Sequence, residues 1–408
     1  MKKYSILFLL SLLMVMGSCE TVDFGDTNEN TNGSQELNSG ALLTAAQRRY
    51  VTIGFRDWLS NPHHYVQYQG QPVYPDPSRY AEAPVNWSAY YSQTLSNLQQ
   101  IINVSQDPAV TETPAYQASG SVANQVAVAR IMKVLIFKRL TDTYGDIPYF
   151  EALNPEILTP AYTPQRDIYQ DFIKELKESR DMLNPEENGA AGDLFYNGDV
   201  ESWQRFANSL LLTVTMQLSE TDLAATAATE FAAALAHPAG VIETVEQEAW
   251  YQPINVGTLV NPWTAFRPAD YNMTEFFQDA FQGDNPDYSN DTFDARINIY
   301  STHPEAPGLV YGLQEGEAEG TPAKISLYIT SPLSPFPILT SGYTYLNRAE
   351  AAELGWTSES ATDMLTNGIV QSYTSTTEKF GMGPHVAADG LTPVDITGEA
   401  AAFAAARV

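Results

Sequence analysis

The sequence predicts an all-α protein in which antiparallel helix pairs support long loops. Apolar residues recur at helical spacing in many segments of the 408-residue chain, whereas few segments alternate polar and apolar residues with a period of two. The predicted helices are joined by long segments rich in Pro, Gly and aromatic residues, at 60–86, 184–199, 238–268, 282–294 and 303–340. Loops of this length in a compact domain are usually functional or disordered.

The helices follow one another along the whole chain. Segment 42–59 has a mixed apolar pattern, and 87–103 is one clear helical face with an apolar residue every three or four positions. Residues 121–141 are apolar almost all round, which predicts a core helix, and the four cations in this segment argue against a membrane span. Further helices are expected at 167–183, 202–218, 222–236, 271–281, 342–354 and 360–379, and short strands at 322–330. The helices could pair like tetratricopeptide units, although no clean repeat period is found.

The N-terminus has the features of a bacterial lipoprotein signal peptide over residues 1–18. Two lysines form the positive n-region, an apolar run follows, and small residues lead to Cys19, the only cysteine in the chain. We predict that Cys19 becomes the lipidated first residue and that the acidic, Asn/Gly-rich residues 19–40 form a tether. The remaining residues, 41–408, are expected to form a single domain, and no later apolar run is long enough to span a membrane.

Composition and charge narrow the classes of function. Hydrophobic residues make up 44% and aromatic residues 11% of the chain, as in a globular protein. The 21 Lys and Arg against 49 Asp and Glu give a formal net charge of −28. Such a surface repels phosphate backbones, so a nucleic-acid partner is excluded and a neutral or cationic ligand is favoured.

No motif for catalysis or metal binding is found. The sequence lacks G-x-S-x-G, H-E-x-x-H, Walker, G-x-G-x-x-G and C-x-x-C patterns, and its five histidines lack metal-ligand spacing. Residues 26–30 resemble the start of a calcium loop, but Thr31 and Leu37 occupy its sixth and twelfth positions. The acidic run 284–291 is better explained as a solvated turn, although calcium there stays open. We therefore predict no catalytic residue, no metal site and no cofactor.

The stretch KRLTDTYGDIPY at 138–149 is predicted to be the end of a helix. Lys138 suits the negative end of the helix dipole, Gly145 can adopt the left-handed conformation, and Pro148 forbids continuation. Asp142 and Tyr144 are then expected to bond free backbone groups or to hold the following loop. The stretch is therefore interpreted as structural.

Several longer motifs occur in a characteristic order. The clearest is RIMKVLIFKRLTDTYGDIPYFEAL at 130–153. The others are ALLTAAQ at 41–47, WSAYYSQTLSNLQQII at 87–102, SWQRFANSLLL at 202–212, DARINIY at 294–300, SPFPILTSGYTYLNRAEAAELGW at 334–356, and NGIVQSYTSTTEKFG further on. Together they resemble the SusD/RagB-like outer-membrane lipoproteins, and most closely the shorter SusD-like branch.

The resemblance implies a fold and a function. Members of this family have four tetratricopeptide-like helix pairs and are lipid-anchored at the outer membrane. They bind a nutrient, usually a glycan, and deliver it to a partner TonB-dependent channel without catalysis. Two departures are present: the helix after FANSL lacks the usual arginines, and the chain stops at AAFAAARV, where the family continues through further helices. Internal ion pairs must therefore be replaced, and the chain is expected to be C-terminally incomplete.

Two aromatic patches are the candidate ligand site. Sugars are bound by flat aromatic faces together with polar side chains that reach the hydroxyl groups. The loop 54–80 supplies Trp58, Tyr65, Tyr68 and Tyr74 beside the polar residues Asn61, Gln67 and Gln69, and the second patch consists of Trp250, Tyr251 and Trp263. Loop packing explains any single one of these aromatic residues more simply, so we expect one patch as a set to contact the ligand.

Two alternative functions remain open at this point. A surface glycosidase could use two carboxylates on a helical scaffold. A binder of basic peptides instead of sugars would suit the acidic surface.

Overall fold

A computed structural model describes residues 38–54, 60–81, 87–257, 259–284 and 291–407. The predicted signal peptide, Cys19, the tether up to residue 37, and Trp58 lie outside the described residues. So do residues 285–290 of the acidic run.

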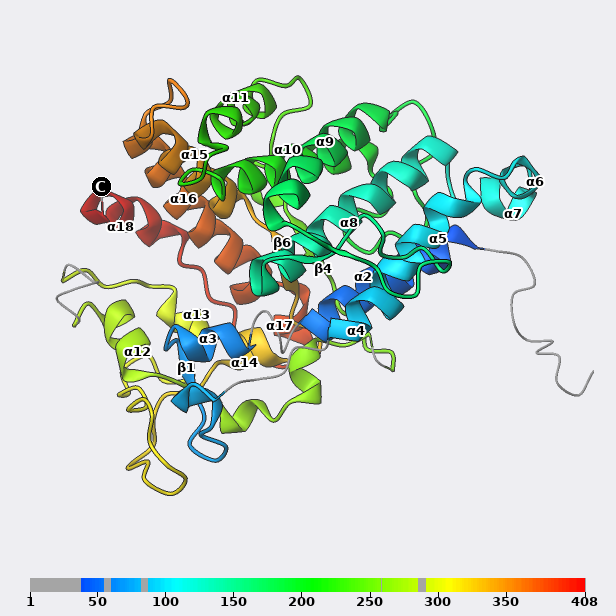
Figure 1. The fold of residues 1–408 in the computed structure, drawn as a ribbon. Helices are drawn as coiled ribbons and strands as arrows, with labels where there is room; N and C mark the ends of the chain where they lie inside the picture. The colour runs from blue at the N-terminus through cyan, green and yellow to red at the C-terminus, as the bar shows by residue number, and fades with distance from the viewer. Residues whose placement is uncertain (1–37, 55–59, 82–86, 258, 285–290, 408) are drawn as a thin grey trace, which may run out of the picture. The chain divides into compact units, whose positions relative to one another are not determined.

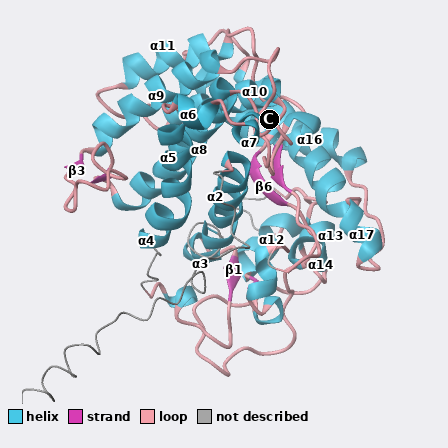
Figure 2. Cartoon of the chain, turned by 90° about the vertical axis from the view of Figure 1, so that its right-hand side faces the viewer, coloured by secondary structure: helices cyan, strands magenta, loops and turns pink. Residues whose placement is uncertain are grey.

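Helices dominate the described chain, as predicted (Figures 1 and 2). The longer helices are α2 (Ser39–Gly54), α5 (Ser96–Val104), α8 (Val122–Tyr144), α9 (Gln165–Met182), α10 (Val200–Met216), α11 (Ala224–Leu235), α12 (Glu275–Gln282), α15 (Ser341–Glu353), α16 (Ala361–Ser375) and α18 (Ala400–Arg407). The short helices are α3 (Asn61–Tyr65), α4 (Trp87–Tyr90), α6 (Pro108–Thr111), α7 (Pro114–Gln117), α13 (Ile297–Tyr300), α14 (Leu327–Thr330) and α17 (Pro384–Ala388). Two π-helical turns, η4 (Tyr91–Leu95) and η8 (Thr376–Gly381), continue α4 and α16.

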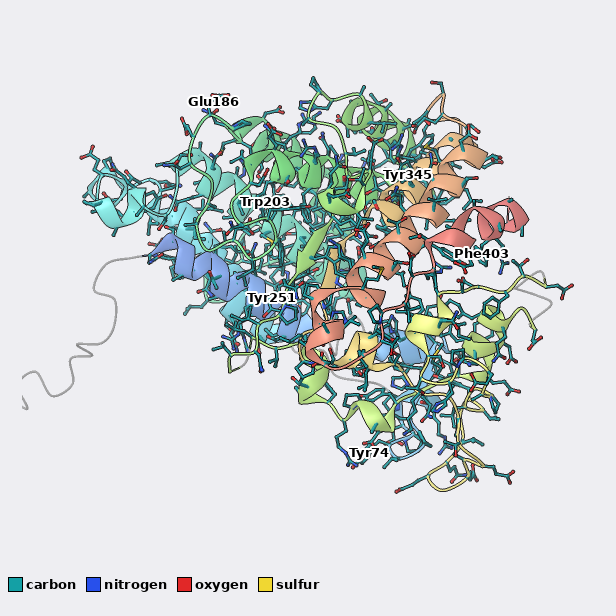
Figure 3. The ribbon with its side chains drawn as sticks, turned by 180° about the vertical axis from the view of Figure 1, so that it is seen from behind. Tyr74, Glu186, Trp203, Tyr251, Tyr345 and Phe403 are labelled. Atoms are coloured by element: carbon teal, nitrogen blue, oxygen red, sulfur yellow. The ribbon has the colours of Figure 1, made fainter. Side chains whose placement is uncertain are left out.

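Helices that follow one another in sequence pack against one another. Contacts join α8 to α9, α9 to α10, α10 to α11, and α15 to α16, and α10 also touches α15. Each helix thus buries its apolar face against its neighbour, and one large core cluster runs through these helices. Trp203 lies within this helical part in Figure 3.

The helix α8 lies at the centre of the core and its cations are paired. Most of its residues are buried, because α2, α5, α9 and α10 all touch it. The Arg130 guanidinium bonds Glu175 of α9 at 2.7 Å, and the Lys133 ammonium donates to Gln99 of α5 at 2.7 Å. The predicted core helix is confirmed, and two of its cations, Arg130 and Lys133, bind neighbouring helices.

The end of α8 falls where the sequence predicts it. The helix ends at Tyr144, and Gly145 has φ 73° and ψ −119°. This φ is positive, as expected, but the ψ lies outside the left-handed helical region that we predicted. Asp142 also differs from the expectation, since its carboxylate accepts from the Lys138 ammonium and the Tyr169 hydroxyl instead of from backbone groups.

The helix α10 shows how ion pairs are replaced within the helical part. Asn208 accepts from the Arg180 guanidinium of α9 at 2.9 Å and donates to the Gly240 carbonyl at 2.8 Å. Further along, Thr213 accepts from the Asn347 amide of α15 at 3.3 Å. Neutral amides and hydroxyls therefore join α10 to its neighbours.

The strands form three two-stranded antiparallel ladders: β1 (Gln69–Gly70) with β5 (Asn272–Met273), β2 (Ile147–Pro148) with β3 (Tyr162–Thr163), and β4 (Ala249–Tyr251) with β6 (Phe336–Leu339). In the first ladder Gln69 pairs with Met273, so segments 200 residues apart in the chain lie side by side. The strand expected at 322–330 is wrong in its second half, which forms α14, while Lys324 and Ile325 make only isolated bridges. Ser326 caps α14 by accepting from the Tyr328 amide, which favours a helical turn over a strand.

Loops and short elements gather at one end of the helical part. In Figures 1 and 2, α3, β1, α12, α13 and α14 lie together there, and Figure 3 places Tyr74 among these loops. The helical part thereby supports a loop-rich region assembled from residues 60–81, 259–284 and 291–330.

Candidate functional site

Helix α3 is held in place by buried polar contacts. The chain enters it through Ser60 and Pro62 and leaves through Gln67, whose φ of 60° turns the chain toward β1. His64 is buried, with Nδ1 3.1 Å from the Ser78 hydroxyl, and the Gln69 amide donates to the Ser60 carbonyl at 2.8 Å. These contacts fix α3 between two cavities.

The first cavity lies beside Tyr68 and is called here the Tyr68 cavity. Its volume is about 260 Å³, and its aromatic and polar walls come from His63, Tyr68, Gln69, Trp263, Phe277 and Tyr300. The Tyr68 ring is 40% exposed and stacks on Phe277 with centroids 4.3 Å apart. Trp263 is only 4% exposed and supplies a rigid wall.

The second cavity lies beside Tyr74 and is called here the Tyr74 cavity. It encloses about 560 Å³, and its walls include Asn61, Tyr74, Asp76, Phe266, Arg267, Asp270 and Tyr271. Tyr74 is 55% exposed, and its hydroxyl accepts from Arg267 at 3.3 Å. Arg267 is also paired with Asp270 at 3.1 Å. This cavity therefore combines an accessible aromatic ring with donors and acceptors for hydroxyl groups.

An exposed tyrosine cluster adjoins α3. The Tyr65 and Tyr80 rings are stacked at 6.2 Å, and Tyr311 meets Tyr80 edge-on at 6.0 Å. The Gln67 amide donates to the Tyr80 hydroxyl at 2.9 Å. Both Gln67 and Tyr80 have φ of 60°, a conformation that non-glycine residues rarely adopt and that is concentrated at functional sites.

Each of these two cavities has, in a wall residue, a buried polar atom that is not bonded by any described residue. Gln69 lines the Tyr68 cavity, and no described residue bonds its Oε1; Asn61 lines the Tyr74 cavity, and no described residue bonds its Nδ2. Both side chains are more than nine-tenths buried. An unsatisfied buried polar group costs about 1–3 kcal/mol, so each amide would gain a hydrogen bond from a partner that reaches it through a shift of the cavity wall.

The histidines of α3 are neutral at physiological pH. Burial lowers the pKa of His63 to about 4, and burial followed by the His63 charge lowers the pKa of His64 to about 4. Burial also raises the pKa of Tyr311 to about 12. The walls around α3 therefore present neutral rings, which suits an uncharged ligand.

The structure regroups the residues predicted from sequence. Tyr68 and Trp263, which we placed in separate patches, line the same cavity. Tyr74 lines the second cavity, and Tyr65 belongs to the tyrosine cluster. Tyr251 is buried at 2% exposure and donates its hydroxyl proton to the Leu259 carbonyl.

Trp250 is separated from these residues. It is buried and lines a third cavity with Phe380. Sequence reasoning missed Phe277 and Tyr300, because these residues reach the site only through the pairing of β1 with β5 and the fold of the loops. Tyr80 was also missed, although it lies in the loop 54–80 itself, beside Tyr65.

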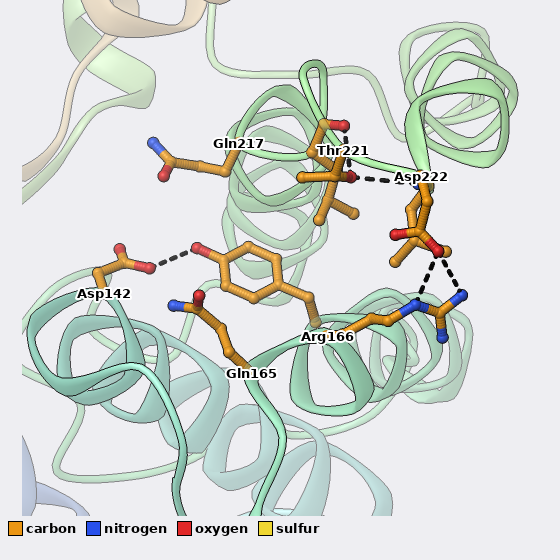
Figure 4. A pocket seen from close by; sticks show the side chains of 9 residues that line it. Asp142, Gln165, Arg166, Gln217, Thr221 and Asp222 are labelled. Carbon is orange, nitrogen blue, oxygen red and sulfur yellow. Dashed lines mark hydrogen bonds and ion pairs between the residues drawn. The ribbon is translucent and has the colours of Figure 1, made fainter.

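A pocket at the end of α8 has a different character. It encloses about 280 Å³ and is shown in Figure 4. Its polar groups bond one another: Tyr169 donates to Asp142, and the Arg166 guanidinium binds Asp222 at 2.9 Å. The interpretation of KRLTDTYGDIPY as a structural stretch is consistent with this pairing.

Among the described residues, no helix is long and apolar enough to cross a membrane. In the same part of the chain, no three or more His, Cys, Asp or Glu side chains gather where they could hold a metal ion.

Paired helices that carry a loop-rich end with aromatic cavities define a helical protein with candidate ligand-binding cavities. A model of the SusD-like_2 family, described as starch-binding and associating with the outer membrane, matches residues 31–383. The chain therefore belongs to the SusD-like family of nutrient-binding proteins.

Solved structures agree with this family. A chitin-binding protein is 26% identical, with 90% of this chain and 79% of that chain covered and a TM-score of 0.72. A SusD homologue from Parabacteroides distasonis is 22% identical, with 83% and 72% covered and a TM-score of 0.68. A chitin-binding SusD homologue from Flavobacterium johnsoniae is 22% identical, with 83% and 70% covered and a TM-score of 0.63. No curated protein matches the chain.

Proposed function

We propose that this protein binds a neutral glycan at the Tyr68 and Tyr74 cavities and delivers it to a partner TonB-dependent channel. One observation carries the choice of site: each cavity pairs a partly exposed tyrosine with a buried amide atom that no described residue bonds. A sugar ring can stack on the tyrosine while its hydroxyl groups bond the amides.

The protein acts at the outer membrane as a binder. Cys19 carries the lipid that anchors it to the cell surface, in line with the family's association with the outer membrane. It releases no product from the glycan. Tyr65, which stacks on Tyr80, extends the proposed contact surface, and Trp58 stays a predicted contact outside the described residues.

Relatives suggest the first ligands to test. Two of the similar structures bind chitin, and the family is described as starch-binding. Chitin and starch oligosaccharides are both neutral, which suits the uncharged histidine rings of α3 and the compensated charge of Arg267.

The direct test is affinity electrophoresis of the lipid-free protein through gels that contain glycol chitin or starch, with released sugars assayed in the same mixtures. We expect retardation without product. Tyr68→Ala and Tyr74→Ala should each weaken binding by about ten-fold, since an aromatic stack contributes roughly 0.5–1.5 kcal/mol beyond its buried area. Tyr162→Ala is the matched control, because Tyr162 is also exposed and lines neither cavity.

Three results would count against the proposal. If neither polysaccharide slows migration, a glycan ligand is excluded. Release of product would indicate a glycosidase instead. Equal losses in all three tyrosine variants would show that the α3 cavities are not the site.

The anchor has a separate test. Cys19→Ser removes the thiol that would carry the lipid, so the protein should move from the membrane fraction to the soluble fraction of its host. Unchanged membrane association would contradict the lipoprotein assignment while leaving glycan binding intact.

A further inference from the structure

The third cavity lies beside Trp250 and is called here the Trp250 cavity. It encloses about 420 Å³ and is formed by β4, α13, α15, α16 and η8. Its aromatic walls are Trp250, Tyr300, Tyr343 and Phe380. It lies outside the two cavities that flank α3.

The Trp250 ring is fixed by a buried carboxylate. Its indole N–H donates to Glu248 Oε2 at 2.8 Å, and the Ser375 hydroxyl donates to the same oxygen at 2.7 Å. The other oxygen of Glu248 accepts from the Ser341 hydroxyl at 2.6 Å and the Ser341 amide at 2.9 Å. Every partner is a neutral donor, so the carboxylate holds the ring rigidly and has little capacity left for a ligand.

The remaining polar groups favour a neutral partner with hydroxyl groups. The Arg296 charge is compensated by Asp294 at 2.5 Å, and Arg296 also donates to the Ser372 hydroxyl at 2.7 Å. Ser372 donates to no described residue, so its own proton is available to a ligand. A sugar unit matches this combination of aromatic wall, spare hydroxyl and compensated charge.

Tyr300 connects this cavity to the proposed binding site. The ring lines both the Trp250 cavity and the Tyr68 cavity, and it packs against the hydrophobic clusters on both sides. Its hydroxyl is 2.9 Å from the Thr376 hydroxyl of η8, which fixes the ring. The two cavities are therefore neighbours that share Tyr300 as a wall.

We propose that the Trp250 cavity is a second subsite, which takes a further sugar unit of the same glycan chain. This inference rests on the proposed glycan-binding function and specifies its ligand as an extended oligosaccharide. Trp250 and Tyr343 form the walls of the subsite, and Ser372 bonds a hydroxyl group of the added unit.

The test measures affinity by calorimetry for one oligosaccharide series, from disaccharide to octasaccharide. Leu346→Trp places a bulky ring at the rim of the Trp250 cavity. Leu354→Trp is the matched control, because Leu354 is equally exposed, at 44% against 45%, and lines none of the three cavities.

The wild type and the control should gain about ten-fold in affinity from the shortest to the longest ligands, as expected for one more aromatic stack. Leu346→Trp should lose this gain and keep its disaccharide affinity.

A second readout does not depend on a cavity variant. In protein labelled with 5-fluorotryptophan, the Trp250 signal is assigned by its absence in Trp250→Phe. It should shift when octasaccharide is added and stay unchanged with disaccharide. Three outcomes would overturn the second subsite while disaccharide binding persists. Leu346→Trp could keep the gain in affinity with chain length, the Trp250 fluorine signal could stay unchanged with octasaccharide, or the wild type could bind all lengths equally well. Absence of binding at every length would instead overturn the proposed function.

Discussion

At the scale of single residues, Asp193 is a buried carboxylate bonded only by neutral donors. One oxygen accepts from the Trp203 indole at 2.8 Å and the Gly198 amide at 3.0 Å, and the other accepts from the Gln47 amide at 2.8 Å. It thereby ties the loop before α10 to α2. Glu248 likewise ties β4, α15 and α16 together, because its carboxylate accepts hydrogen bonds from the Trp250 indole, the Ser341 amide and the Ser375 hydroxyl.

Asp193→Asn should destabilise the protein by about 2–3 kcal/mol, because an amide N–H₂ would replace one acceptor of several charge-assisted hydrogen bonds. The midpoint of urea unfolding measures this loss. Asp199→Asn is the matched control, since Asp199 caps α10 through the Ser202 amide and Asn caps helices equally well. Equal shifts for the two variants would show that the Asp193 contacts are not the cause.

Gly145 is a second residue with a specific structural role. Its φ of 73° with ψ of −119° is accessible to glycine alone, while a Cβ there would meet no atom within 4 Å. Gly145→Ala should therefore destabilise the protein by about 1–3 kcal/mol through backbone strain alone. Gly398→Ala, which has equally open space and no positive φ, should be nearly neutral in the same thermal unfolding experiment. A neutral Gly145→Ala would mean that the chain can end α8 in another conformation.

At the scale of elements, the helices could be predicted from sequence, whereas the loops that line the candidate site could be predicted only in part. Helical periodicity is local, so the predicted helix 202–218 lies within two residues of α10 at each end. The ladder between β1 and β5 joins residues 200 positions apart, and nothing in either short segment indicates its partner. For that reason Tyr68 and Trp263 were assigned to different patches, and Tyr300 was not found.

Helix α3 should loosen as the pH falls. The folded pKa values of His63 and His64, about 4, lie below the unfolded value of about 6.5, so acidification protonates the unfolded state first. The contribution of the two neutral histidines to the stability of the fold is complete above pH 6.5 and is lost as the pH falls toward 4. At pH 5 the loss amounts to roughly 1–2 kcal/mol per histidine.

Hydrogen exchange measures this loosening at the amides of Gln67 and Tyr68, which donate to the His64 and His63 carbonyls. Both should exchange faster at pH 5 than at pH 7 after correction for the intrinsic rate. His63→Gln with His64→Gln should remove the difference. A difference that persisted in this double variant would assign the pH response to other groups.

At the scale of the whole molecule, the net charge of −28 separates the two binding hypotheses. A basic peptide would be attracted by this charge, and its affinity would fall steeply as salt screens the attraction. A neutral glycan feels no such attraction, and the rings around α3 are uncharged near pH 7. We therefore expect the affinity for chitin or starch oligosaccharides to change less than about two-fold when salt is raised from roughly 0.01 M to 1 M. Over this range the screening length falls about ten-fold.

Calorimetry with one oligosaccharide and one lysine-rich peptide compares the two ligands directly. Tight, salt-sensitive binding of the peptide, without binding of the oligosaccharide, would reassign the cavities to peptide transport.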